Sequence, residues 1–188
     1  LDGKRVCVQM QLSVLPGHEA CWTRVLMSLT DITARKRAEA ELAWVSSHDG
    51  LTGLRNRAHF NRMLSALEPL RTMPVSLVVM DLDGLKPTND TLGHAAGDRL
   101  LQRAGRLIAS LAPAGSTAAR IGGDEFALLL PGWAQPEADA WAARLRAALA
   151  QEQARTDPAL GVLEFSIGSA ARAAGAEEAI GAVLHRAD

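Results

Sequence analysis

The most informative part of this chain is the stretch Ala119-Arg120-Ile121-Gly122-Gly123-Asp124-Glu125-Phe126-Ala127-Leu128-Leu129-Leu130. Two apolar, strand-like runs flank two glycines and two adjacent carboxylates. A Gly-Gly pair between such runs predicts a β-hairpin, because glycine adopts the positive φ angles of tight turns. The glycines also leave room for a bulky group beside the backbone. The pattern therefore favours a polyphosphate over the turn, bridged by Mg²⁺ to Asp124 and Glu125.

The composition indicates a soluble protein with a proper core. The chain has 188 residues, of which 48% are apolar, so wholesale disorder is excluded. Its 20 basic and 21 acidic side chains argue against broad binding to a nucleic acid polymer. No apolar run is long enough to span a membrane, and no signal-peptide pattern opens the chain. Cys7 and Cys21 are too few for a disulfide framework and are predicted to be buried thiols. We therefore expect a cytoplasmic location.

The first 47 residues differ in character from the rest. Strands are predicted over 6–12 and 22–29, with a break at 16–18. The stretch 34–42 is helical in composition, and Thr33 is its expected N-cap. Its short apolar stripe is not long enough to establish a coiled coil.

From His48 onward helices alternate with strands. Asn56 is expected to cap a helix over 57–70, and the continuous apolar run 75–80 predicts a buried central strand. Further elements are predicted, namely helices over 98–111, 133–151 and 177–185 and a strand over 161–169. Together with the Gly-Gly hairpin, this order predicts an α+β fold with a central, mostly antiparallel sheet flanked by helices.

A second pair of carboxylates, Asp81 and Asp83, follows the predicted central strand. The alternative is that they only begin a turn, which Gly84 would favour. If the strand and the hairpin are neighbours, Asp81 can meet Asp124 or Glu125 at one ion. Because Mg²⁺ keeps several waters, two or three carboxylates suffice to bind it.

Polar residues suited to a nucleotide come next. Lys86 is a compact positive charge that suits phosphate. Asn89 and Asp98, on successive helical segments, offer an amide and a carboxylate that match the donors and acceptors of guanine. An adenine would leave these groups mispaired, at a cost of roughly 1–3 kcal/mol per buried group. The alternatives are that Asn89 and Asp98 are helix caps and that Lys86 is solvated.

Together these motifs resemble the GGDEF family of diguanylate cyclases, over about 48–188. Four stretches match in the order found in the family: Asp49-Gly50-Leu51-Thr52-Gly53-Leu54-Arg55-Asn56-Arg57, then Asp81-Leu82-Asp83-Gly84-Leu85-Lys86-Pro87-Thr88-Asn89-Asp90 with Gly93-His94 and Gly97-Asp98, then Gly122-Gly123-Asp124-Glu125-Phe126, and finally Ser166-Ile167-Gly168.

The resemblance implies condensation of two GTP molecules into cyclic di-GMP with release of pyrophosphate. Each domain holds one GTP, so a homodimer is implied. Asp81, Asp124 and the backbone carbonyl of Leu82 would hold Mg²⁺ or Mn²⁺. Glu125 would act at the metals or phosphates, and Lys86 would stabilise the triphosphate. The family's proton acceptor for the attacking 3′-hydroxyl maps to Asp124. The substrate-binding positions implied are Asn89, His94, Asp98, Gly122 and Gly123.

Three departures from the family pattern are visible. Leu85 stands where the family has phenylalanine, a packing change that we expect to be tolerated. The Arg-x-x-Asp motif of product inhibition is absent, and Pro113 and Ser116 occupy its positions. The family continues beyond the position of Asp188 with a phosphate-contacting lysine and arginine, so the domain over 48–188 is expected to be truncated at its C-terminal end.

The segment 1–33 resembles the C-terminal end of a PAS sensor domain, and 34–47 its signalling helix. The sequence at Asp31-Ile32-Thr33, followed by the charged run 35–39, carries this likeness. A generic hairpin and a solvated charged helix are the alternative. The leading hypothesis is thus a PAS-regulated diguanylate cyclase. The alternative is a weak or inactive module that binds GTP or cyclic di-GMP and regulates an attached effector, such as a phosphodiesterase domain. The first 47 residues could also act mainly in dimerisation.

Overall fold

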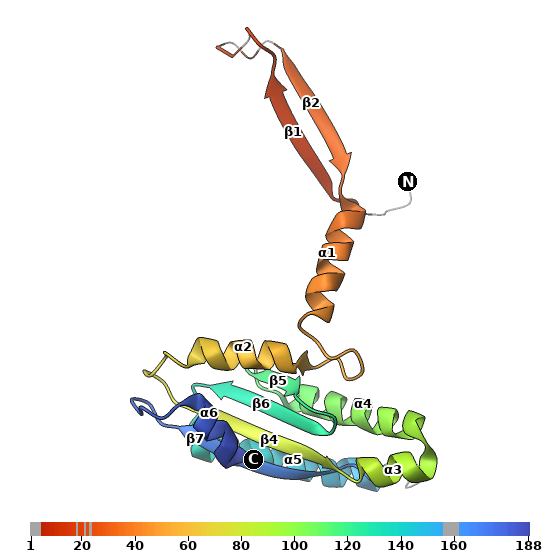
Figure 1. The fold of residues 1–188 in the computed structure, drawn as a ribbon, viewed down its shortest axis with the longest axis vertical. Coiled ribbons are helices and arrows are strands. Elements are labelled where there is room, and N and C mark those ends of the chain that lie inside the picture. Colours follow the sequence, from red (N-terminus) through yellow and green to blue (C-terminus); the bar gives the residue numbers. More distant parts are fainter. Residues whose placement is uncertain (1–4, 18, 21, 23, 156–161) are drawn as a thin grey trace. The chain divides into compact units, whose positions relative to one another are not determined.

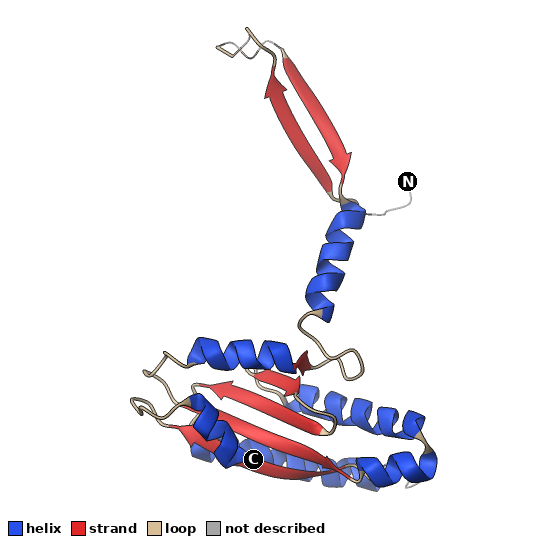
Figure 2. Ribbon diagram, viewed as in Figure 1, coloured by secondary structure: helices blue, strands red, loops and turns tan. Residues whose placement is uncertain are grey.

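The computed structural model describes residues 5–17, 19–20, 22, 24–155 and 162–188. It divides the chain into two compact units, Leu1–Val45 and Ser46–Asp188 (Figure 1). Each unit has its own secondary structure (Figure 2). Within the described residues, no helix combines the length and apolar character needed to cross a membrane.

The first unit is a β-hairpin followed by a helix. Strands β1 (Val8–Val14) and β2 (Val25–Asp31) pair antiparallel, and helix α1 (Thr33–Val45) follows. The predicted strands are present, each displaced two or three residues toward the C-terminus. The register places apolar residues opposite one another, as in Met10 with Leu29. Because alternate strand residues share one face, the hairpin has an apolar face, and its apolar side chains are largely exposed.

Two expectations for this unit were wrong. Thr33 is the first residue of α1 rather than its N-cap. The Asp31 carboxylate instead accepts the backbone N–H of Thr33 at 2.8 Å, while the Thr33 hydroxyl accepts that of Cys7 at 2.8 Å. The Cys7 thiol is free and exposed, not buried, because it lies beside an uncovered hairpin. Cys21 lies outside the described residues.

The second unit is built on one sheet. Its described strands lie in the order β3-β5-β6-β4-β7, and only β3 and β5 pair in parallel. The mostly antiparallel sheet predicted from the sequence is therefore confirmed. The strands are β3 (Arg55–Asn56), β4 (Val75–Asp83), β5 (Thr117–Arg120), β6 (Glu125–Pro131) and β7 (Glu164–Arg172).

Helices cover both faces of this sheet. On one face, α4 and α5 pack on the even residues of β4, such as Met80; on the other, α2 and α6 pack on odd residues such as Leu77 (Figure 1). Both residues are fully buried. The alternation arises because successive strand residues point to opposite faces. The helices are α2 (Arg57–Leu67), α3 (Leu85–Leu92), α4 (His94–Leu111), α5 (Gln135–Arg155) and α6 (Ile180–Ala187).

The local predictions for this unit differ from the structure mainly at element ends. Asn56 caps α2, as expected, by accepting the N–H of His59 at 2.9 Å. Strand β4 continues through Asp83, so the carboxylates of Asp81 and Asp83 belong to the strand rather than follow it. Helix α4 begins at His94, four residues before the predicted start. The predicted beginning of the last strand, at 161, lies outside the described residues, and β7 runs from Glu164.

Candidate functional site

The strand register brings the predicted carboxylates together. In the antiparallel pair of β4 and β6, Asp81 lies opposite Glu125. The N–H of Leu82 donates to the carbonyl of Asp124 at 2.9 Å. The expected neighbourhood of strand and hairpin is thus confirmed. Asp81 continues the odd series of β4 residues that faces α2 and α6, at the end of the strand where apolar residues give way to polar ones.

The carboxylates repel one another. Partial burial raises the pKa of Asp81, and the negative charges of Asp124, Asp83 and Glu125 raise it further. Within the described part of the chain, no ion pair reaches Asp81, Asp124 or Glu125. Among the residues that the structure describes, these three carboxylates are therefore not neutralised by an ion pair.

The donor set suits a hard divalent cation that keeps much of its water. No three His, Cys, Asp or Glu side chains of the described residues are close enough to form a complete metal cluster. Two carboxylates and the Leu82 carbonyl are nevertheless the oxygen ligands that Mg²⁺ takes in proteins, with water completing the shell. The charge repulsion at Asp81 is what such a cation would relieve.

The Gly-Gly turn differs from its prediction. Neither Gly122 nor Gly123 has a positive φ. Four residues, 121–124, connect β5 to β6, and a connection of that length does not need the mirror-image turns of a two-residue hairpin. The glycine at 122 instead provides space: a Cβ there would overlap the Glu125 carboxylate, whose carbon would lie 2.9 Å away. At Gly123 a Cβ would meet nothing within 4 Å, so the backbone is open to approach.

Arg120 connects this turn to the start of the second unit. Its guanidinium donates to the carbonyl of Gly123 through Nε at 3.1 Å and Nη2 at 2.6 Å. Nη1 donates to the Asp49 carboxylate at 3.3 Å. Burial alone would raise the pKa of Asp49, but hydrogen bonds from Thr52 and the charge of Arg120 bring it below its ordinary value. Sequence reasoning missed this role, although a lone arginine ending an apolar strand was a visible signal.

The remaining predicted residues lie on α3 and α4. Lys86 and Asn89 belong to α3, and His94 and Asp98 to α4. Lys86, His94 and Asp98 are exposed, and Asn89 is half-buried. Asn89 and Asp98 are not helix caps, since both lie inside their helices; Gly93, with φ of 81°, separates the two helices. Asn89 packs against Gly97, the residue before Asp98. Among the described residues, no side-chain hydrogen bond or ion pair is recorded between Lys86 or His94 and another predicted site residue.

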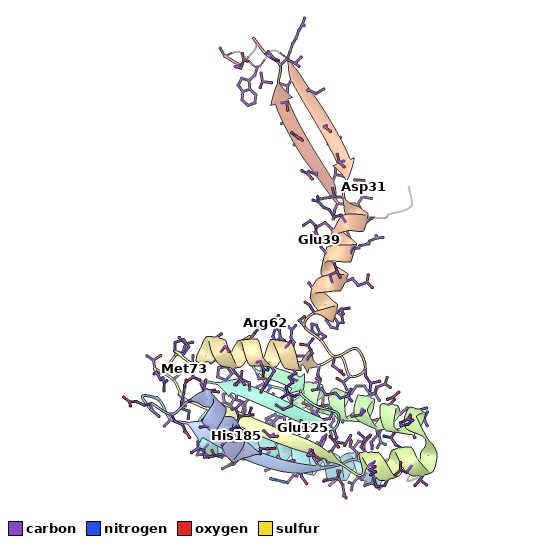
Figure 3. The ribbon with its side chains drawn as sticks, viewed as in Figure 1. Asp31, Glu39, Arg62, Met73, Glu125 and His185 are labelled. Atoms are coloured by element: carbon purple, nitrogen blue, oxygen red, sulfur yellow. The ribbon has the colours of Figure 1, made fainter. Side chains whose placement is uncertain are left out.

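Helix α6 closes the other side of the carboxylates. A cavity of about 140 Å³ is lined by Glu125 together with His185 and Asp188, and the first two are labelled in Figure 3. A second cavity, of about 210 Å³, joins Asp81 to Asp188. Gly168 of β7 permits this closure, because a Cβ there would overlap the carbonyl of Ala187. Nothing in the local sequence signals that His185 and Asp188 approach the site.

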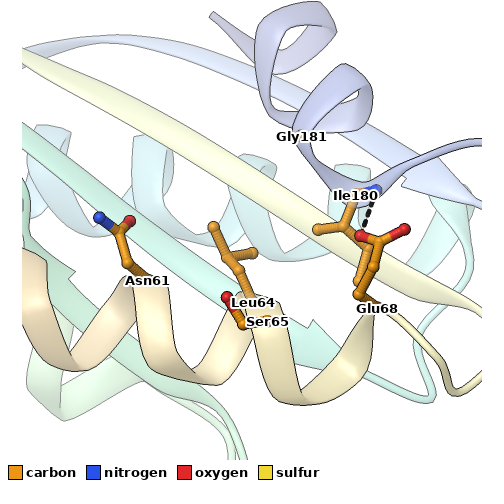
Figure 4. Close-up of a pocket in the computed structure, with 6 residues that line it drawn as sticks. All are labelled: Asn61, Leu64, Ser65, Glu68, Ile180 and Gly181. Carbon is orange, nitrogen blue, oxygen red and sulfur yellow. Dashed lines mark hydrogen bonds between the residues drawn. The ribbon is translucent and has the colours of Figure 1, made fainter.

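A larger groove contains none of these groups. It has a volume of about 530 Å³ and lies between α2 and α6. Leu64 and Ser65 of α2 and its C-cap residue Glu68 line it with Ile180 (Figure 4). The Glu68 carboxylate accepts the N–H of Ile180 at 2.9 Å, which fixes the start of α6 on α2. We interpret this groove as a seam between packed helices.

Comparison with known proteins agrees with this geometry. Among curated proteins, the chain is 41% identical over 111 residues to "Probable diguanylate cyclase DgcE" of Escherichia coli K12. This alignment covers 56% of the present chain and 10% of DgcE. The chain is 51% identical over 98 residues to an uncharacterised Streptomyces griseus protein, covering 49% of this chain and 39% of that one. The chain thus spans well under half of these relatives.

Solved structures share the fold. The coiled coil and GGDEF domain of DgcB from Caulobacter crescentus, in complex with c-di-GMP, superposes with a TM-score of 0.71 at 31% identity, covering 82% of this chain and 84% of that one. Diguanylate cyclase SiaD of Pseudomonas aeruginosa, in complex with its activator SiaC, gives a TM-score of 0.68 at 28% identity, with coverage of 82% and 61%.

The family profile described as "Diguanylate cyclase, GGDEF domain" matches residues 46–188, which is the whole of the second unit. This match agrees with the sheet, in which carboxylates pair across β4 and β6 beside the glycine turn. The chain therefore belongs to the GGDEF-domain family of diguanylate cyclases.

Proposed function

We propose that this chain condenses two molecules of GTP into cyclic di-GMP and pyrophosphate. The observation that carries the proposal is the pairing of Asp81 with Glu125 beside the Gly122-Gly123 turn, where the carboxylates repel one another and no ion pair among the described residues neutralises them. A cluster of this kind suits a cation-bound polyphosphate. The family membership supplies the reaction class.

The carboxylates are proposed to hold Mg²⁺ or Mn²⁺ through Asp81, Asp124 and the carbonyl of Leu82. Such an ion neutralises phosphate charge and orients the α-phosphate for in-line displacement. Glu125 lies opposite Asp81 and acts at the metal or the phosphates. Lys86, exposed in the first turn of α3, stabilises the triphosphate.

Substrate recognition is assigned to the α3–α4 pair and the glycine turn. The Asn89 carboxamide and the Asp98 carboxylate read guanine, and His94 lies in the same substrate-facing region. The absence of a side chain at Gly123 allows the phosphates to approach the turn, and the absence of one at Gly122 leaves room for the Glu125 carboxylate beside them. In each of two displacements, a 3′-hydroxyl oxygen bonds to the α-phosphorus of the other GTP and pyrophosphate leaves. The hydroxyl proton passes to Asp124 or to solvent.

The two displacements need two GTP molecules antiparallel to one another, so a homodimer is proposed. The first 33 residues are proposed to be the end of a PAS sensor and 34–47 its signalling helix, with the GGDEF domain over 48–188. The apolar face of β1 and β2 supports this assignment, because a strand pair exposed on both faces is marginal in water and requires a covering partner.

A second candidate is a nucleotide-binding module without turnover, which regulates an attached effector. The DgcB structure holds c-di-GMP, so product binding to this chain is the corresponding expectation.

The deciding experiment incubates the chain with GTP and MgCl₂ and detects cyclic di-GMP by mass spectrometry. Calorimetry with a non-hydrolysable GTP analogue is run in parallel. Turnover supports the cyclase, and guanine-nucleotide binding without turnover supports the module. If neither turnover nor binding is observed, both candidates are wrong.

Variants assign the metal role. Asp124→Asn should abolish turnover and weaken Mn²⁺ binding, because it removes one of two carboxylate ligands. Glu177→Gln is the matched control, since Glu177 is exposed and has no ion pair among the described residues. Full turnover by Asp124→Asn would contradict the assignment.

A further inference from the structure

Asn89 and Gly97 occupy a shared space between α3 and α4. A Cβ at Gly97 would overlap the Oδ1 atom of Asn89, and would lie 2.9 Å from its Cγ and 3.2 Å from Cδ1 of Leu85. Unstrained carbon–carbon contacts are about 3.5–4.0 Å. The present position of the Asn89 carboxamide therefore requires that residue 97 have no side chain.

The backbone gives no other reason for this glycine. Gly97 is buried in the interior of α4 and has no positive φ. Glycine at an ordinary helical position destabilises a helix by roughly 0.5–1 kcal/mol relative to alanine. Gly105, on the same helix, is different: a Cβ there would press on Thr52, including its backbone oxygen at 3.2 Å. Gly105 is therefore needed because the Thr52 backbone lies close to α4. Gly97 instead leaves room for the polar side chain of Asn89.

That side chain has little else to hold it. Within the described residues, no hydrogen bond is recorded for the Asn89 carboxamide, whose position is thus set by packing against Gly97. Asp98 follows Gly97 directly. The same turn of α4 therefore contains both the glycine that contacts the Asn89 amide and the Asp98 carboxylate.

We propose that Gly97 is a positioning residue that sets selectivity for guanine. By lacking a Cβ, it lets the Asn89 amide lie against α4 beside Asp98, where both groups meet the base. This inference rests on the proposed function. Because the colliding atom is the end of a side chain with two free torsions, Gly97→Ala rotates the amide away and leaves the fold intact.

The test is calorimetric titration of the chain with a magnesium complex of α,β-methylene-GTP and with its inosine counterpart, which lacks the exocyclic amine. Gly97→Ala is expected to lower the affinity for the guanosine analogue about tenfold or more. It should also reduce the preference for the guanosine analogue over the inosine analogue. Gly181→Ala is the matched control, because a Cβ at that helical glycine meets nothing within 4 Å. Thermal unfolding checks that both variants stay folded.

A double variant separates positioning from a general structural effect. In the Asn89→Ala background the amide is gone, so adding Gly97→Ala should change the affinity for the guanosine analogue by less than about twofold. An equal loss in both backgrounds would show a structural effect and overturn the proposal. Wild-type affinity and selectivity in Gly97→Ala would also overturn it, with the proposed function intact. Failure of the wild-type chain to bind any guanine nucleotide would overturn both.

Discussion

Arg120 offers the sharpest test of how the site is held. Its guanidinium joins the Gly123 carbonyl, three residues away in the chain, to the Asp49 carboxylate, which is 71 residues from Arg120. The side chains of Arg120 and Asp49 are only 15% and 24% exposed. The planar fork of arginine makes both contacts at once, whereas the single ammonium of lysine has no such geometry. Arg120→Lys is therefore expected to release either the turn or Asp49.

The magnitude follows from the bonds lost. Hydrogen bonds to charged groups contribute about 1.5–3 kcal/mol when formed, and partial exposure and the retained charge reduce the net loss. We expect a local destabilisation of about 1–2 kcal/mol. Since exchange through local opening scales with the opening equilibrium, amides of the turn should exchange roughly 5–30 times faster.

The assay is hydrogen exchange followed by mass spectrometry on peptides that cover 48–54 and 120–126. Arg106→Lys is the control, because Arg106 is exposed on α4 and has no recorded ion pair within the described residues. Unchanged exchange in both peptides of Arg120→Lys, or an equal change in the control, would refute the reasoning.

The same pair has a defined pH dependence. The pKa of Asp49 is lowered in the folded chain, by hydrogen bonds from Thr52 and by Arg120, against the opposing effect of burial. A lowered carboxyl pKa stabilises the fold above the unfolded value of about 3.9, and this contribution is lost as the pH falls through the folded value. The difference between wild type and Arg120→Lys should thus be constant near neutral pH and shrink below about pH 4. A difference that persists in full at lower pH would contradict the ion pair.

Two further predictions concern buried and crowded groups. Arg172 is fully buried and donates to the carbonyls of Leu67, Glu68 and Leu70. Arg172→Met should therefore lower the free energy of unfolding in urea by about 3 kcal/mol or more; a loss below about 1 kcal/mol would contradict this. Gly122→Ala should displace the Glu125 carboxylate and weaken Mn²⁺ binding in calorimetry, while Gly181→Ala should not. Equal affinities in the two variants would show that Gly122 does not set the carboxylate.

Elements with a local cause could be predicted from the amino-acid sequence. Asn56 caps α2 because its side chain reaches an N–H three residues ahead. Residues 75–80 of β4 are buried because all but one of them are apolar and burying apolar surface is favourable. The order of helices and strands was enough to predict a mostly antiparallel sheet. The sequence predicted that Asp81 meets Asp124 or Glu125 only if the strand and the hairpin are neighbours, and the pairing of β4 with β6 meets that condition.

Contacts between segments distant along the chain could not be predicted in this way and become visible in the folded structure. Which elements become neighbours sets three such contacts. These are the bridge of Arg120 to Asp49, the burial of Arg172 against three carbonyls, and the approach of Asp188 to Asp81. The glycines make the same point: the positive φ expected at Gly122 and Gly123 is absent, and the need at Gly122 and Gly97 is for space beside Glu125 and Asn89. A glycine in a sequence does not reveal whether it is there for backbone freedom or for room, because the neighbour that requires the room is placed by the fold.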